Sequence, residues 1–144
     1  MALYLDTAYV AKCYLNESDA DAVRALVHGV TGLTSSAWCR AELACVLRRH
    51  VQDGGLSASQ ARTLHDLFVQ DVRSGVWNLV PVSDAVLTAV EQKLRAMRRR
   101  NVFLRAGDAV HLATAAAAGF RELWTSDRRL LAAARSFGVR GRHV

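Results

Sequence analysis

A short strand-like segment at residues 2–5 runs directly into Asp6 and Thr7, and a helical pattern begins at Thr7. The same change from strand to helix recurs where residues 122–126 run into Asp127. A strand that enters a helix in this way is the first half of a β–α–β unit. Such units place their strands parallel, so the pattern predicts an α/β fold with three layers, a parallel sheet covered by helices on both faces.

The alternation of strands and helices continues along the whole chain. The predicted strands are residues 2–5, 32–35, 77–82, 122–126 and 139–144. The predicted helices are about residues 7–15, 19–28, 36–50, 57–72 and 83–100, one that ends near residue 118, and one at 127–137. Ser57 and Ser83 suit helix N-caps, and glycines mark several breaks. No linker, repeat or low-complexity tract interrupts this pattern, so we expect residues 1–144 to form a single domain.

Length and composition exclude several classes of protein. A chain of 144 residues can bury a sizeable core, and no apolar run approaches the ~18–20 residues of a membrane helix. The start of the chain lacks the basic and apolar regions of a signal peptide. Three cysteines without a Cys-x-x-Cys pair argue against disulfides and against a zinc site. We therefore expect a cytoplasmic protein with no membrane association.

The chain is basic, with a net charge of +6, and nearly all of its basic residues are arginine. One interpretation is affinity for a phosphate backbone, which is largely electrostatic. The other is a compositional bias of a chain rich in alanine and arginine. The basic run at residues 98–100 is equally ambiguous, because cations at the end of a helix also stabilise the helix dipole.

Four acidic residues occupy positions that suit a shared site. Asp6 and Asp127 each follow a strand, where ligands bind in open parallel sheets, although either could simply cap its helix. Glu42 and Asp108 fall on or beside the apolar stripes of their predicted helices, and a buried carboxylate needs a partner. For Asp108 the structural alternative is an ion pair with Arg105, one turn earlier; for Glu42 it is a distant arginine.

If these four acids converge at the carboxyl edge of the sheet, a cation has to join them. Two carboxylates ~4 Å apart repel by about 4 kcal/mol at an effective dielectric near 20. A set of oxygen ligands favours Mg²⁺, with Mn²⁺ as a further candidate, over zinc. A metal-binding acidic cleft in a basic protein suits phosphodiester hydrolysis, in which the metal neutralises the phosphate and activates water.

Four segments carry a resemblance to a known family. They are residues 5–8 (Leu-Asp-Thr-Ala), the helix that holds Glu42 after residues 34–36, residues 105–114, and residues 125–130. In this order they resemble the PIN-domain ribonucleases, and among these the VapC-type toxins of toxin–antitoxin pairs. The resemblance covers essentially the whole chain. It implies a five-stranded parallel sheet of order 3-2-1-4-5, Mg²⁺-dependent cleavage of RNA, neutralisation by a small antitoxin protein, and a homodimer.

The resemblance also implies roles for individual residues. The family's four acids correspond to Asp6, Glu42, Asp108 and Asp127, which would be the catalytic metal ligands; the fourth is less uniformly essential in the family. Thr7 and Thr125 stand where a hydroxyl can support the site. Arg105 is a further supporting candidate.

Several other side chains have two interpretations. His111 follows Asp108 by one helical turn and could face the site, but a hydrogen-bonded core histidine is favoured. Trp38, Trp77 and Trp124 each lie in an apolar stretch, which favours the core over a platform for nucleic-acid bases. The arginines at 128 and 129 flank Asp127 and suit either phosphate contact or a solvated helix face.

The competing functional hypothesis is a non-catalytic binding or receiver domain with a flavodoxin-like or PIN-like fold. A receiver needs an acidic pair after the first strand and a lysine after a late strand, whereas Lys12 and Lys93 are the only lysines and neither follows one. A phosphatase with an aspartyl nucleophile needs Asp-x-Asp, and Ala8 stands where the second acid would be. The presence of all four acids argues against a degenerate fold that only binds a partner.

Overall fold

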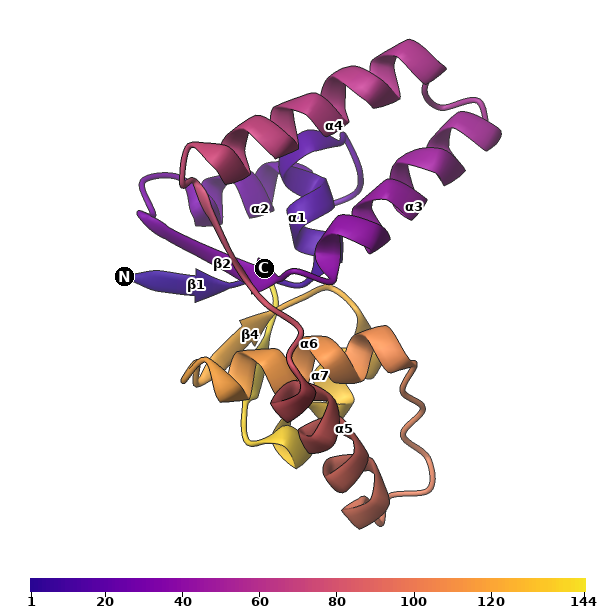
Figure 1. Cartoon of the computed structure of the whole chain (residues 1–144). Helices are drawn as coiled ribbons and strands as arrows, with labels where there is room; N and C mark the ends of the chain where they lie inside the picture. The colour runs from indigo at the N-terminus through magenta and orange to yellow at the C-terminus, as the bar shows by residue number, and fades with distance from the viewer.

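The computed structural model describes residues 1–144 and contains parallel strands alternating with helices, as predicted (Figure 1). The strands are β1 (Ala2–Tyr4), β2 (Gly32–Ser36), β3 (Trp77–Val80), β4 (Glu122–Trp124) and β5 (Arg140–Arg142). The helices are α1 (Thr7–Tyr14), α2 (Ala20–Val27), α3 (Cys39–Gln52), α4 (Ala58–Arg73), α5 (Asp84–Ala96), α6 (Ala106–Ala117), α7 (Arg128–Ala133) and the short 3-10 helix η1 (Ala134–Phe137). The predicted α/β class is confirmed.

The strands do not form the single five-stranded sheet that was predicted. They form a three-stranded sheet of order β1-β2-β3 and a two-stranded sheet of β4 and β5, with every pair parallel. One parallel bridge, between Leu5 and Trp124, joins the two sheets, and the Asp6 N–H donates to the Trp124 carbonyl at 3.1 Å. Neighbours along the molecule therefore keep the order 3-2-1-4-5, but β1 and β4 pair only where they end.

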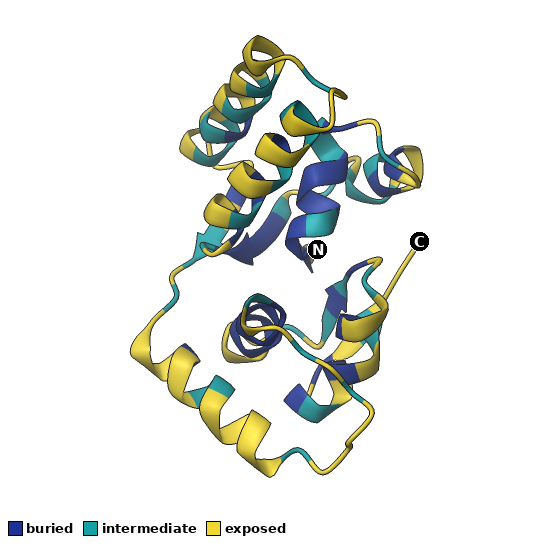
Figure 2. Cartoon of the chain, turned by 90° about the vertical axis from the view of Figure 1, so that its right-hand side faces the viewer, coloured by how far each residue is buried: buried dark blue, intermediate teal, exposed yellow.

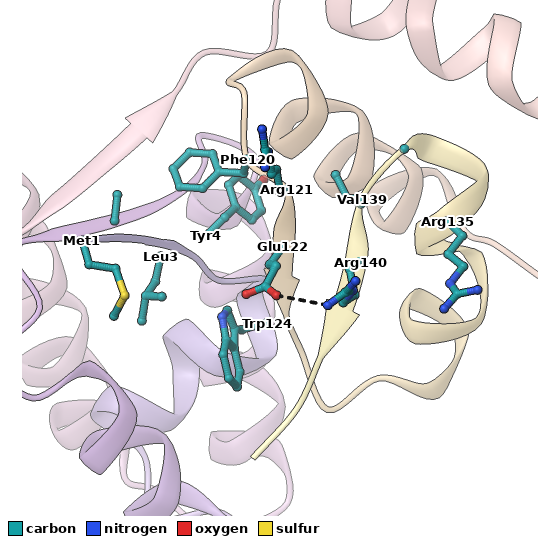
Figure 3. Close-up of a pocket in the computed structure, with 12 residues that line it drawn as sticks. Met1, Leu3, Tyr4, Phe120, Arg121, Glu122, Trp124, Arg135, Val139 and Arg140 are labelled. Carbon is teal, nitrogen blue, oxygen red and sulfur yellow. Dashed lines mark ion pairs between the residues drawn. The ribbon is translucent and has the colours of Figure 1, made fainter.

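Two aromatic side chains meet next to the junction of β1 and β4. The ring of Tyr4, the last residue of β1, packs edge to face on the ring of Phe120, which precedes β4, with centroids 5.6 Å apart (Figure 3). Together with Trp124 they line a pocket with a volume of ≈ 780 Å³. None of the four acids lines this pocket, so it is separate from the predicted site.

Strand β1 divides the core into two clusters. Leu3 and Leu5 belong to a cluster with the residues of α1, α3 and α4, whereas Tyr4, between them in sequence, belongs to a cluster formed with α6 and β4. This follows from the period of two along a strand, which directs successive side chains to opposite faces. Helices α1–α4 lie on one side of the three-stranded sheet and α5–α7 on the other (Figure 1).

Helices α5 and α6, on the same side of the sheet, differ in burial. Helix α6 is buried along most of its length, whereas α5 buries only Val86 (Figure 2). The α5 helix ends at Ala96, so the basic run at residues 98–100 lies outside the helix that was predicted to include it. At the chain's end, the predicted helix is split into α7 and η1, and β5 has only three residues.

Ser57 and Ser83 cap α4 and α5 as predicted. The Ser57 hydroxyl accepts from the Gln60 N–H at 3.0 Å, and the Gln60 side chain accepts from the Ser57 N–H at 2.9 Å, a complete capping box. The Ser83 hydroxyl accepts from the Val86 N–H at 3.3 Å. None of the helices combines the length and the apolar composition that a bilayer span requires.

A polar link ties α1, α4 and β3 together. The Tyr14 hydroxyl donates to Asp71 at 2.5 Å and accepts from the indole N–H of Trp77 at 2.8 Å. Trp77 is only 3% exposed, as the sequence predicted for this residue, so its N–H has no ready access to water. We expect Tyr14→Phe to lower the free energy of unfolding by about 1–3 kcal/mol, because a buried donor then lacks a partner.

Urea denaturation at neutral pH measures this effect. Tyr9→Phe is the matched control, because the Tyr9 hydroxyl accepts only from the N–H of the terminal residue, Val144, at 2.9 Å. A Tyr14→Phe variant as stable as Tyr9→Phe would contradict the role assigned to this link.

Candidate active site

Asp6 serves as a helix cap and lies at the predicted site at the same time. Its Oδ1 accepts from the Tyr9 N–H at 3.0 Å, which caps α1, and its Oδ2 accepts from the Thr125 hydroxyl at 2.5 Å. Asp6 is only 3% exposed and Thr125 is fully buried. The Thr125 hydroxyl in turn accepts from the Asp127 N–H at 2.9 Å, so it connects the ends of β1 and β4.

Glu42 is held from two other elements. It lies in the first turn of α3, and its Oε1 accepts from the Thr7 hydroxyl at 2.8 Å and lies 2.7 Å from Nε2 of His111. Nδ1 of His111 lies 3.2 Å from the Tyr4 hydroxyl. His111 is 2% exposed and hydrogen-bonded on both nitrogens, which confirms the core interpretation. Its contact with Glu42 was missed, although its position one turn after Asp108 had pointed to the site.

Asp108 and Asp127 share one cation, Arg105. Asp108 Oδ2 accepts from the backbone N–H and from Nε of Arg105, both at 3.3 Å, which is the ion pair weighed as the structural alternative. The Arg105 Nη2 lies 3.6 Å from Asp127 Oδ2. Asp127 also caps α7, because its Oδ1 accepts from the Arg129 N–H at 2.8 Å. The cap interpretation is therefore correct for both strand-end acids, without removing either from the site.

The pKa values of these groups reflect one connected electrostatic system. Burial raises the pKa of Asp6 from 3.8 to about 6; the charge of His111 and the Thr125 hydrogen bond oppose this, and the charge of Asp127 adds to it. For Glu42, burial also raises the pKa, but the hydrogen bond and charge of His111 outweigh it, so that the net pKa is below its usual value. Asp108, and then Asp127 and Glu42, raise the pKa of Arg105.

The donor set fits a hard divalent cation in its chemistry. The site offers carboxylate oxygens and hydroxyls, and the Arg105 guanidinium supplies positive charge between Asp108 and Asp127. In this conformation no three side chains of histidine, cysteine, aspartate or glutamate converge closely enough to hold a metal ion. The acids do not meet directly: Thr125 and Arg105 connect Asp6, Asp127 and Asp108, and Thr7 and His111 hold Glu42.

The three tryptophans have different environments. Trp77 is in the core, and Trp124 is half-buried with an indole N–H that is buried without a hydrogen-bond partner. Trp38 is 41% exposed, so the prediction that it belongs to the core is wrong. It immediately precedes α3, and the Ser36 hydroxyl, which accepts the Trp38 N–H at 3.1 Å, turns the chain there toward the surface.

Residues 3–136 match the model of the PIN domain. The chain belongs to the PIN-domain family. This confirms the family resemblance carried by the four sequence segments. PIN domains are generally nucleases, which supports the prediction of an enzyme that cleaves phosphodiester bonds.

Solved structures share this PIN fold over nearly the whole chain. VapBC2 from Rickettsia felis, bound to a promoter DNA fragment, has a TM-score of 0.70 and 13% identity, covering 99% of this chain and 98% of that one. FitAcB from Neisseria gonorrhoeae has a TM-score of 0.71 and 17% identity, with coverage of 96% and 95%. VapC20 of Mycobacterium tuberculosis, a sarcin-ricin loop cleaving toxin, has a TM-score of 0.65 and 17% identity, covering 92% of this chain and 95% of that one. Comparison with curated proteins gives no significant match.

The raised pKa of Asp6 predicts how the stability of the metal-free PIN domain depends on pH. The folded state keeps the Asp6 proton up to about pH 6, whereas the unfolded state loses it near 3.8. The folded state thus binds more protons in this window, and the free energy of unfolding falls as pH rises through it. We expect Asp6→Asn, which preserves the cap, to be roughly 1–3 kcal/mol more stable than the wild type at pH 7.5 in EDTA.

Urea melts at pH 4.5 and pH 7.5 measure the difference between the two proteins. The gain should shrink toward zero at pH 4.5, where the wild-type carboxyl is protonated in the folded state. Asp66→Asn, at an exposed position of α4, is the control and should show no such dependence. A variant that is less stable than the wild type at both pH values would contradict the prediction.

Proposed function

We propose that this PIN domain is a metal-dependent endoribonuclease that hydrolyses phosphodiester bonds of RNA with Mg²⁺, or Mn²⁺, as its cofactor. The observation that carries the proposal is the arrangement of four carboxylates around the carboxyl ends of β1 and β4. Asp6, Asp127 and Asp108 are connected through Thr125 and Arg105, and Glu42 is held by Thr7 and His111. A purely structural role would not require four acids in one region, because like charges near one another are unfavourable.

The side chains divide into ligands and groups that position them. Asp6, Glu42, Asp108 and Asp127 would hold the metal, which when bound would neutralise phosphate charge and activate water. Thr125 fixes the carboxylate plane of Asp6, and Thr7 and His111 fix that of Glu42. Arg105 balances the charge of Asp108 and Asp127 in the metal-free protein.

The surroundings of the acids support a phosphate-containing substrate. Arg128 and Arg129 are exposed at the start of α7, directly after Asp127, and the chain carries a net charge of +6. Cations beside an acidic metal site can hold the strand on either side of the bond to be cut. This arrangement favours a nuclease over the alternative of a non-catalytic binding domain.

We further propose that the enzyme is the toxin of a toxin–antitoxin pair in the cytoplasm. The similar solved structures include VapBC2, FitAB and VapC20, the last of which is a sarcin-ricin loop cleaving toxin. On this proposal the partners are a cognate antitoxin protein and a second copy of the chain.

Ribonuclease assays on purified protein test the catalytic proposal. We expect Mg²⁺ or Mn²⁺ to support cleavage of RNA and EDTA to stop it. Asp6→Asn, Glu42→Gln and Asp108→Asn should each lower the rate by at least about 100-fold, as expected when a group essential to transition-state stabilisation is removed. Asp127→Asn should retain partial activity. Asp66→Asn is the matched control, because Asp66 is an exposed acid on α4, a helix that carries none of the site residues.

Full activity in excess EDTA would contradict the metal mechanism. Near wild-type cleavage by one of the three variants would contradict the role of that residue alone. Binding of RNA without cleavage under every condition would instead support the non-catalytic alternative.

Arg105 contacts both Asp108 and Asp127, and this leads to a prediction that can be tested without an activity assay. Arg105 and a metal ion would compete for Asp108 and Asp127, because both are positive and need the same oxygens. We expect Arg105→Gln to lower stability in EDTA by about 1 kcal/mol, a modest value because Arg105 is 59% exposed. The same change should strengthen Mn²⁺ binding, measured by calorimetric titration.

Arg128→Gln is the control for charge alone, because Arg128 makes no ion pair in the structure. Mn²⁺ binding by Arg105→Gln that is weaker than that of Arg128→Gln would show that Arg105 helps to assemble the ligands, and would contradict the competition.

A further inference from the structure

An exposed tryptophan stands directly beside Glu42. Trp38 is 41% exposed, and its indole Nε1 lies 2.8 Å from the position that a Cβ at residue 107 would take. Glu42 Oε2 lies 2.9 Å from the same position. Only glycine leaves this space free, so Gly107 allows the indole, the carboxylate and the first turn of α6 to meet. Trp38 therefore lies at the Glu42 side of the acidic network.

An exposed phenylalanine stands on the Asp127 side of the same network. Phe103 precedes α6 by a few residues and is 65% exposed. The guanidinium carbon of Arg129 lies 5.5 Å from the centre of the Phe103 ring, a cation–π contact. The backbone N–H of Arg129 is held by Asp127, which ties the aromatic ring and its cation to the end of β4.

Packing does not explain why these two rings are exposed. Burial of an aromatic side chain is strongly favourable, and aromatic residues usually contribute to cores or to binding surfaces. Trp38 lies beside Glu42, and Phe103 is connected to Asp127 through Arg129. Exposed aromatic rings near carboxylates and arginines suit a ligand in which flat apolar parts alternate with charged parts.

We propose that Trp38 and Phe103 are platforms on which bases of single-stranded RNA stack on either side of the bond to be cut. This inference rests on the proposed ribonuclease function and adds two positioning residues to it. Proteins hold single strands by stacking bases on aromatic rings while cations follow the phosphates. Arg129 at the Phe103 ring and its neighbour Arg128 provide such cations.

The cations favour RNA over a protein partner at these two rings. Arg128 and Arg129 are exposed beside Asp127 and form no ion pairs, so their charge is available to a phosphate backbone. A partner protein that covered Trp38 and Phe103 with apolar side chains would have to desolvate these charges without compensation. An acidic protein segment remains the competing occupant and is one outcome of the test.

Binding of a fluorescein-labelled single-stranded RNA, followed by anisotropy in EDTA, tests the proposal. Every variant is made in the Asp6→Asn protein, called the background, so that the RNA stays intact. We expect Trp38→Ala and Phe103→Ala each to weaken binding by about 5- to 100-fold, the range for loss of one stacked base. Trp38→Phe should stay within about threefold of the background, because it keeps an aromatic face, whereas Trp38→Leu should behave like Trp38→Ala.

Two further measurements separate stacking from charge and from misfolding. RNA should quench the fluorescence of Trp38, and Trp38→Phe should lose this quenching, because Trp77 is buried and the half-buried Trp124 lines the separate pocket beside Tyr4. The slope of log affinity against log salt should not change in the aromatic variants but should fall by about 1 in Arg129→Gln. Leu67→Ala, which alters an equally exposed apolar side chain of α4, should bind RNA like the background.

Unchanged RNA affinity in both alanine variants would overturn the proposal and assign the rings to a protein partner. Equal losses in Trp38→Phe and Trp38→Ala would overturn the stacking mechanism as well. Failure of the proposed function would be a separate result. If the wild-type protein never cleaves RNA with Mg²⁺ but the aromatic variants still lose RNA affinity, the two rings bind RNA in a protein that is not a ribonuclease.

Discussion

Mutual repulsion of four carboxylates is the constraint on which this site depends. The structure answers it with polar partners, two of which are shared. Arg105 lies between Asp108 and Asp127, and the Thr125 hydroxyl connects Asp127 to Asp6. Glu42 has partners of its own, Thr7 and His111. Because Arg105 and Thr125 each contact two acids, removal of either one changes the environment of more than one carboxylate.

Asp6 and Asp127 show that one aspartate can cap a helix and also contribute a carboxylate oxygen to the site. The N-terminus of a helix presents free N–H groups and a partial positive charge, both of which favour a carboxylate. Asp6 and Asp127 use one oxygen in this way and direct the other toward the site. The local geometry that ends the strand and begins the helix therefore also lowers the free energy of keeping a charge there, which partly offsets the burial that raises the pKa of Asp6.

The sequence predicted what depends on local pattern and missed what depends on packing at a distance. The strands, the caps and the positions of Asp6 and Asp127 follow from hydrophobic period and cap chemistry, which act over a few residues. The divided sheet does not, because the pairing of β1 with β4 depends on residues more than a hundred positions apart in the sequence. Trp38 was assigned to the core because its neighbours in sequence are apolar, yet the chain turns outward just before α3.

The bridge between Leu5 and Trp124 is the only β pairing between the two sheets, and Asp6 follows it by one residue. The Asp6 N–H donates to the Trp124 carbonyl, its Oδ1 caps α1, and its Oδ2 accepts from Thr125. One residue is therefore bonded to both halves of the molecule, through its backbone and through both carboxylate oxygens. Correct folding at this junction and correct placement of the first acid are the same structural event.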